Sequence, residues 1–111
     1  MPQLHYKRLI SLDDFLPTVA FVAKSLSDEN RLRILLCVSE AKKSVSGIEE
    51  ELNLSQPLVS HHLKELRRAL LVKVERRGPF VYYEIADPRI VQILAALKDL
   101  ATDLLAARTT F

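Results

Sequence analysis

Two short helical segments, joined by a tight turn and followed at once by a hairpin pattern, lie in the middle of this 111-residue sequence. The run Ser46–Glu49 has the Ser-x-x-Glu form of a capping box, which predicts the start of a short helix. Asn53 tolerates the left-handed conformation that ends helices. Ser55 as N-cap and Pro57 in the first turn predict a second helix, which with its cap spans residues 55–69. The order predicts a helix-turn-helix.

Residues 71–76 and 80–85 alternate in polarity, are rich in β-branched and aromatic residues, and flank Arg77-Gly78-Pro79. We therefore expect a β-hairpin over residues 71–85. Apolar residues at helical spacing predict further helices over 12–26, around 31–38 and over 88–107. The expected fold is mainly α (α+β), a single winged helix-turn-helix domain spanning residues 1–111, with five helices, a two-stranded wing and an N-terminal arm at 1–11.

The second helix of the pair has a predicted core face of Val59, Leu63, Leu66 and Leu70, at spacings of four, three and four. The first and last helices carry wide apolar stripes that a domain of this size cannot cover alone. We therefore expect a homodimer through those two helices. The predicted interface residues are Leu12, Phe15, Leu16, Val19, Ile93, Leu97, Leu100 and Leu104.

The formal net charge is only +2, but six basic and two acidic residues lie between His61 and Pro79. This concentration of charge favours double-stranded DNA as the partner. Bases would be read by Gln56, Ser60 and His61, with Ser55 and Pro57 at the helix N-terminus. Phosphate contacts are expected from Lys64, Arg67 and Arg68, and contacts to flanking phosphate or the minor groove from Arg76, Arg77 and Gly78.

Three motifs together resemble the ArsR/SmtB family of bacterial repressors: DENRLRILL, LNLSQPLVSHHLKEL and VKVERRGPFVYYEI. The resemblance covers roughly residues 12 to 105. It implies a dimer formed by the first and last helices, which binds an imperfect inverted repeat in a promoter and releases it when an inducer binds. In this family Gly is common at the position of Leu70.

Many members of that family sense soft metals through a Cys-Val-Cys triplet, and the matching residues here are Ser44, Val45 and Ser46. Others use Asp and His residues on the last helix, where this chain has Asp99 and Asp103 but no histidine. Neutral hydroxyls and two carboxylates make a poor site for a soft or transition metal. We therefore expect no metal site and no cofactor, and the sequence identifies no inducer.

Cys37 is the only cysteine, and its apolar helix favours a buried, inert thiol. A redox-responsive repressor that uses Cys37 remains an alternative, as does a winged-helix protein-interaction module without specific DNA binding. An enzyme is not expected, because no catalytic pair or phosphate-binding glycine loop is found. The chain has no signal stretch and no apolar run of about 18 to 20 residues, so we expect a cytoplasmic, nucleoid-associated protein of a bacterium or archaeon, without membrane contact.

Overall fold

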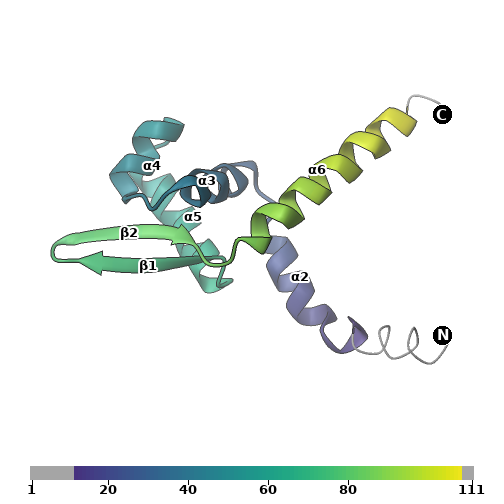
Figure 1. Cartoon of the computed structure of the whole chain (residues 1–111), viewed down its shortest axis with the longest axis horizontal. Coiled ribbons are helices and arrows are strands. Elements are labelled where there is room, and N and C mark those ends of the chain that lie inside the picture. The colour runs from purple at the N-terminus through teal and green to yellow at the C-terminus, as the bar shows by residue number, and fades with distance from the viewer. Residues whose placement is uncertain (1–11, 109–111) are drawn as a thin grey trace.

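A computed structural model describes residues 12–108. The elements are, in order, α2 (Leu16–Ser25), α3 (Glu29–Glu40), α4 (Val45–Leu52), α5 (Gln56–Arg68), β1 (Val72–Arg77), β2 (Phe80–Ile85) and α6 (Arg89–Arg108). The predicted fold class is confirmed, since the chain forms a mainly helical winged helix-turn-helix with a two-stranded hairpin (Figure 1). The predicted arm at residues 1–11 lies outside the described residues.

The hydrophobic core forms around α3, with α4 and α5 packed on it and the base of the hairpin closing one side. Burying these aliphatic side chains is the main source of stability, at about 1.5–3 kcal/mol for each large side chain. The core thereby fixes α5 and the hairpin relative to each other. Fully buried side chains include Ile34, Leu35, Val38, Ile48, Val59, Leu63 and Leu66.

Local capping sets where the helices begin. Asp28 accepts a hydrogen bond from the Arg31 backbone N–H at 3.0 Å and starts α3. The predicted cap at Ser46 is wrong, because α4 begins at Val45 and Ser44 accepts from the Gly47 N–H at 3.1 Å. Ser55 precedes α5 in the expected extended conformation, but its side chain makes no capping hydrogen bond.

The turn between α4 and α5 depends on Asn53. This residue has φ 54° and ψ 48°, the left-handed conformation, as expected for the end of the first helix. The Leu54 N–H then donates to the Glu49 carbonyl at 3.2 Å, which closes the helix end. The tight turn packs α4 against α5, as a helix-turn-helix requires.

The prediction that Leu70 lies on the core face of α5 is wrong. Helix α5 ends at Arg68, and Leu70 is 79% exposed with φ 61°. The backbone reverses here, because the Leu71 N–H donates to the Leu66 carbonyl at 3.0 Å. Leu71, which is buried, takes the core position instead. Glycine adopts this left-handed conformation without the steric cost that a Cβ brings, so leucine is strained at this position.

The hairpin pairs Val72 with Ile85 at its base and Arg77 with Phe80 at its tip. Arg77 therefore ends β1, although the sequence placed it in the connection. The connection is Gly78-Pro79, and Gly78 has φ 60°, a conformation that two-residue hairpin turns need. Two backbone hydrogen bonds between Lys43 and Tyr83, at 3.0 and 2.8 Å, fasten β2 to the segment between α3 and α4.

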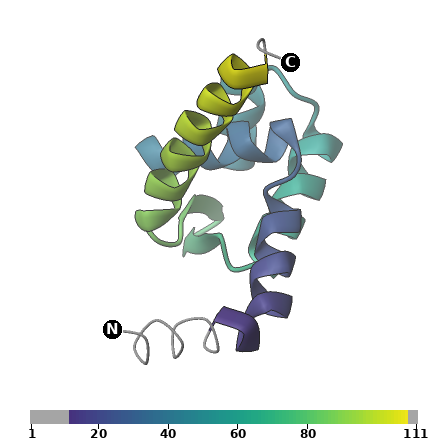
Figure 2. The same ribbon diagram turned by 90° about the vertical axis from the view of Figure 1, so that its right-hand side faces the viewer.

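Helices α2 and α6 project from the body on the side opposite the hairpin tip, and they diverge from each other (Figures 1 and 2). The Cα radius of gyration is 17.2 Å, against about 13 Å for a compact domain of this length. Much of the surface of both helices is therefore left without a covering element. Within residues 12–108, none of the helices is long and apolar enough to cross a membrane.

Candidate nucleic-acid interface

Helix α5 has one buried and one exposed face. Val59, His62, Leu63 and Leu66 are buried against the core. The residues predicted to contact DNA lie on the opposite side and are exposed, with Ser60 half-buried: Ser55, Gln56, Pro57, Ser60, His61, Lys64, Arg67 and Arg68. Such a helix can enter a major groove while its buried face stays packed on the core.

The first two turns of α5 carry neutral hydrogen-bonding groups. The Gln56 Nε2 donates to the Ser60 Oγ at 2.7 Å, which fixes both side chains on the exposed face. The ring of His61, exposed beside them, lies 5.3 Å from the ring of His62 between centroids. Amide, hydroxyl and imidazole groups can both donate to and accept from base edges.

A cationic hollow follows on the last turns of α5, where the helix meets β2. Its volume is about 320 Å³, and it is lined by Ser60, Leu63, Lys64, Arg67, Arg68 and Tyr83. Lys64 and Arg67 make no ion pair with another described residue. The Arg68 Nη1 lies 3.7 Å from the Glu65 Oε1. These cations face solvent at the site where phosphate contacts were predicted. Tyr83 was not predicted here, because strand alternation does not show which of Tyr82 and Tyr83 faces α5.

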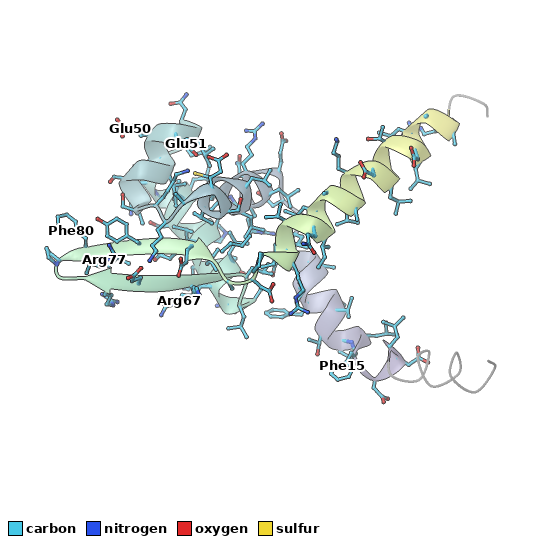
Figure 3. All side chains as sticks on the ribbon, viewed as in Figure 1. Phe15, Glu50, Glu51, Arg67, Arg77 and Phe80 are labelled. Carbon is cyan, nitrogen blue, oxygen red and sulfur yellow. The ribbon has the colours of Figure 1, made fainter. Side chains whose placement is uncertain are left out.

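The hairpin tip carries Arg76, Arg77 and Gly78, all of them exposed. The Arg77 Nε donates to the Glu75 Oε1 at 3.0 Å, and Lys42 also pairs with Glu75. These hydrogen bonds hold the pKa of the Glu75 carboxyl below its usual value. Glu75 offsets part of the charge on Arg77, whereas Arg76 makes no ion pair with a described residue. Figure 3 shows Arg77 on the hairpin and Phe80 at its tip.

A polar junction beneath the exposed face ties α5 to α2 and α3. The Arg31 Nε donates to the Ser25 carbonyl at 2.7 Å, and Arg31 Nη1 lies 3.4 Å from the His62 Nδ1. His62 Nε2 lies 3.7 Å from the Asp28 Oδ1. Burial lowers the pKa of His62, which is only 5% exposed. The junction sets the position of α5 relative to α2.

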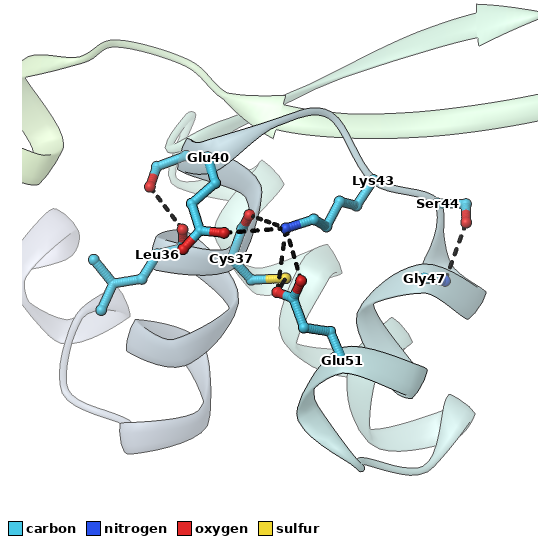
Figure 4. A network of polar contacts seen from close by, with 8 residues as sticks. Leu36, Cys37, Glu40, Lys43, Ser44, Gly47 and Glu51 are labelled. Carbon is cyan, nitrogen blue, oxygen red and sulfur yellow. Dashed lines mark hydrogen bonds and ion pairs between the residues drawn. The ribbon is translucent and has the colours of Figure 1, made fainter.

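Cys37 is buried in a second polar network, between α3 and α4 (Figure 4). Its thiol donates to the Glu51 Oε2 at 2.6 Å, and the Lys43 Nζ donates to the Cys37 carbonyl at 2.8 Å. Burial and the hydrogen bond to Glu51 raise the pKa of the thiol to about 11. The thiol therefore stays protonated near neutral pH, which disfavours reaction with oxidants.

Ser44 and Ser46, which stand where a soft-metal site was considered, are not suited to bind a soft metal. The Ser44 hydroxyl caps α4, and Ser46 Oγ lies 3.2 Å away from it. Neutral hydroxyls are hard, weak ligands for metals that prefer thiolates. Helix α6 offers Asp99 and Asp103 without imidazole. Within residues 12–108, no three His, Cys, Asp or Glu side chains gather at one point. His5 lies outside this range.

The apolar stripes of α2 and α6 are exposed. All eight residues predicted for a dimer interface are between 46% and 61% exposed. Between the two helices lies an apolar groove of about 410 Å³, lined on α2 by residues such as Phe15 and Val19 and on α6 by Ile93 and Leu97. Exposing so much contiguous apolar surface is costly in water.

The family of bacterial regulatory proteins called arsR matches residues 28–74, which span α3 to β1. An uncharacterized HTH-type transcriptional regulator of Methanocaldococcus jannaschii is 35% identical over 82 residues, which are 73% of this chain and 92% of the relative. The transcriptional repressor SdpR of Bacillus subtilis is 36% identical over 64 residues, which are 58% of this chain and 71% of SdpR.

Solved structures of similar fold cover most of the chain. The crystal structure of Rv0081 of Mycobacterium tuberculosis has a TM-score of 0.73 and 32% identity, over 81% of this chain and 91% of that one. A homodimeric winged helix-turn-helix DNA-binding domain of Mycobacterium bovis, described as a possible ArsR-family regulator, has a TM-score of 0.73 and 27% identity. The match covers 83% of this chain and 85% of that domain.

Proposed function

Because this chain belongs to the arsR family of bacterial regulatory proteins, we propose that it is a transcriptional repressor that binds double-stranded promoter DNA as a homodimer. The observation that carries the proposal is the exposed face of α5, where neutral hydrogen-bonding groups are followed by a cationic hollow. Transcriptional regulation is not an enzymatic activity, which agrees with the expectation from the sequence that this protein is not an enzyme. A regulator of this kind acts in the cytoplasm, on the nucleoid.

The two ends of α5 have different roles in this proposal. Gln56, Ser60 and His61 contact base edges in the major groove, while Ser55 and Pro57 bring the helix N-terminus close to a phosphate. Lys64, Arg67 and Arg68 bind the DNA backbone, and the wing places Arg76, Arg77 and Gly78 on the flanking DNA. The first group supplies specificity, and the cations supply affinity that depends on salt.

A second copy of the chain covers the apolar faces of α2 and α6. Its support is the exposed stripe on each helix, together with the homodimeric state of the Mycobacterium bovis domain. Two-fold symmetry would present two α5 helices to two half-sites of an inverted repeat, about 34 Å apart along the DNA. The dimer interface therefore sets the half-site spacing that the protein can recognise.

We propose that repression does not depend on a metal. The support comes from the side chains that would have to bind the metal. Ser44 and Ser46 offer hydroxyls where soft-metal sensors carry thiols, and α6 contains no histidine. The redox-responsive alternative has less support, because the Cys37 thiol is buried and hydrogen-bonded to Glu51.

The proposal is tested by equilibrium binding of the purified protein to DNA upstream of its own gene and to a scrambled duplex, across a salt series with and without zinc. We expect a strong preference for the upstream DNA that zinc does not change. Equal and weak binding to both duplexes would instead favour the protein-interaction module.

Variants of the hairpin tip test the electrostatic part of the proposal. The double variant Arg76→Ala/Arg77→Ala should weaken binding to all sequences and reduce the slope of log K against log[salt] by up to about 0.9 for each phosphate that an arginine no longer neutralises. Arg33→Ala, which removes an exposed cation on α3, is the matched control and should leave the slope unchanged. An unchanged slope in the double variant would exclude the hairpin tip from the interface.

A further inference from the structure

Phe80 is an exposed aromatic residue at the tip of the hairpin. Its side chain is 60% exposed, although it is the first residue of β2 and pairs with Arg77, the last residue of β1. Side chains directly opposite in an antiparallel pair point to the same face, with Cβ atoms about 5 Å apart. A surface that contacts Arg77 is therefore within reach of Phe80 (Figure 3).

The fold itself does not use the Phe80 ring. Alternation along β2 puts Tyr83 and Ile85 against the core, and places Phe80 and Tyr82 on the other face of the strand. The ring centroid of Phe80 lies 6.5 Å from that of Tyr82 in a tilted arrangement, the one aromatic contact it makes within residues 12–108. Removing the ring should therefore leave the core and the hairpin intact.

The surroundings of Phe80 favour DNA as the surface that covers the ring. A single exposed apolar side chain is common and by itself indicates nothing. This one, however, follows a two-residue turn directly and lies opposite the cation Arg77, while Arg76, which pairs with Val81, lies on the other face of the hairpin. Proteins that bind the minor groove combine basic side chains with apolar side chains that enter the groove. The deoxyribose edges that line this groove are apolar, while the phosphates along its rims are anionic.

We propose that Phe80 packs against deoxyribose edges in the minor groove next to each half-site, while Arg77 beside it and Arg76 on the other face of the hairpin contact phosphates. This inference rests on the proposed function and adds an apolar contact to it. Such a contact contributes affinity by removing apolar surface from water, so it releases no counterions. The contribution of Phe80 is then independent of salt, unlike that of Arg76.

The test compares Phe80→Ser with Arg76→Gln on upstream duplexes of two lengths, one complete and one trimmed at both ends so that the flanking minor groove is missing. On the complete duplex, Phe80→Ser should weaken binding by about tenfold, as expected when roughly half of a phenylalanine is buried, with an unchanged salt slope. Arg76→Gln should reduce the slope. On the trimmed duplex the wild-type protein should bind more weakly than on the complete one, and Phe80→Ser should not weaken that binding further.

Two controls separate a direct contact from a change in the fold. The thermal midpoint of Phe80→Ser should equal that of the wild type, and Leu70→Asn, which removes an exposed apolar side chain away from the tip, should not change DNA affinity. An equal loss for Phe80→Ser on both duplexes, or no loss on either, would overturn the inference. If the wild type does not prefer upstream DNA at all, the proposed function fails as well, so the two failures are distinguishable.

Discussion

Replacing Leu70 by glycine should stabilise the protein, which is unusual for a change from leucine to glycine. Leu70 has φ 61°, and the left-handed conformation costs a residue with a Cβ about 1–2 kcal/mol. Against this, glycine loses more backbone entropy on folding, about 0.5–1 kcal/mol. Because Leu70 is 79% exposed, its removal gives up little buried apolar area. The expected net effect of Leu70→Gly is a gain of about 0.5–1 kcal/mol.

The assay is denaturation followed by circular dichroism, by heat and by urea, at one fixed protein concentration, because dimer stability depends on concentration. A gain of this size should raise the thermal midpoint by about 2–6 °C. Leu70→Ala is the matched control, since it removes the same exposed side chain but keeps the Cβ and its strain. If Leu70→Gly is less stable than the wild type, or if Leu70→Ala gains as much, backbone strain at this position is refuted.

Leu97→Glu should dissociate the proposed dimer, since burying a carboxylate at an apolar interface costs several kcal/mol. Sedimentation should then show a monomer for this variant, whereas Gln92→Glu, an exposed control on the same helix, should remain dimeric. Burial lowers the pKa of His62, so the unfolded chain binds the proton more readily, and the free energy of unfolding should fall as the pH drops below 6.5; His62→Gln should flatten this dependence in urea denaturation, and an unchanged curve would contradict the assignment. The Cys37 thiol should resist iodoacetamide at pH 8 in the folded protein and react in urea, whereas rapid alkylation of the folded protein would revive the redox alternative.

Much of the fold could be predicted from periodicity alone. The spacing of apolar residues identified the helices and the hairpin, because these patterns report directly which face is buried. Helix ends were harder. The apolar stripe of Val59, Leu63 and Leu66 continues in the sequence to Leu70. In the structure, however, α5 ends at Arg68, and the backbone hydrogen bond from the Leu71 N–H to the Leu66 carbonyl reverses the chain before Leu70 can join the core face. Periodicity carries no information about such a reversal.

The capping serine shows a similar limit. Ser44 and Ser46 both precede Gly47, and the rule that favours a glutamate three residues later selects Ser46. The backbone bridge between Lys43 and Tyr83 instead fixes where the chain enters α4, so Ser44 becomes the cap. A contact between residues so far apart in the chain outweighs the local preference.

The candidate site was predicted in outline but not in its contacts. The exposed face of α5 follows from the helical period, yet the facing of Tyr83 toward α5 does not. The ion pair of Glu75 with Lys42 and the hydrogen bond between Cys37 and Glu51 join residues from different parts of the chain. Only the packing of the elements brings such groups together.

We propose above all that the exposed face of α5 reads DNA sequence. The most direct test is the ratio of affinities for upstream and scrambled DNA, measured at one salt concentration for the wild type and for Gln56→Ala/Ser60→Ala. We expect this ratio to fall by at least about tenfold in the variant while affinity for scrambled DNA hardly changes, because base contacts carry specificity. An unchanged ratio in a folded, dimeric variant would contradict it.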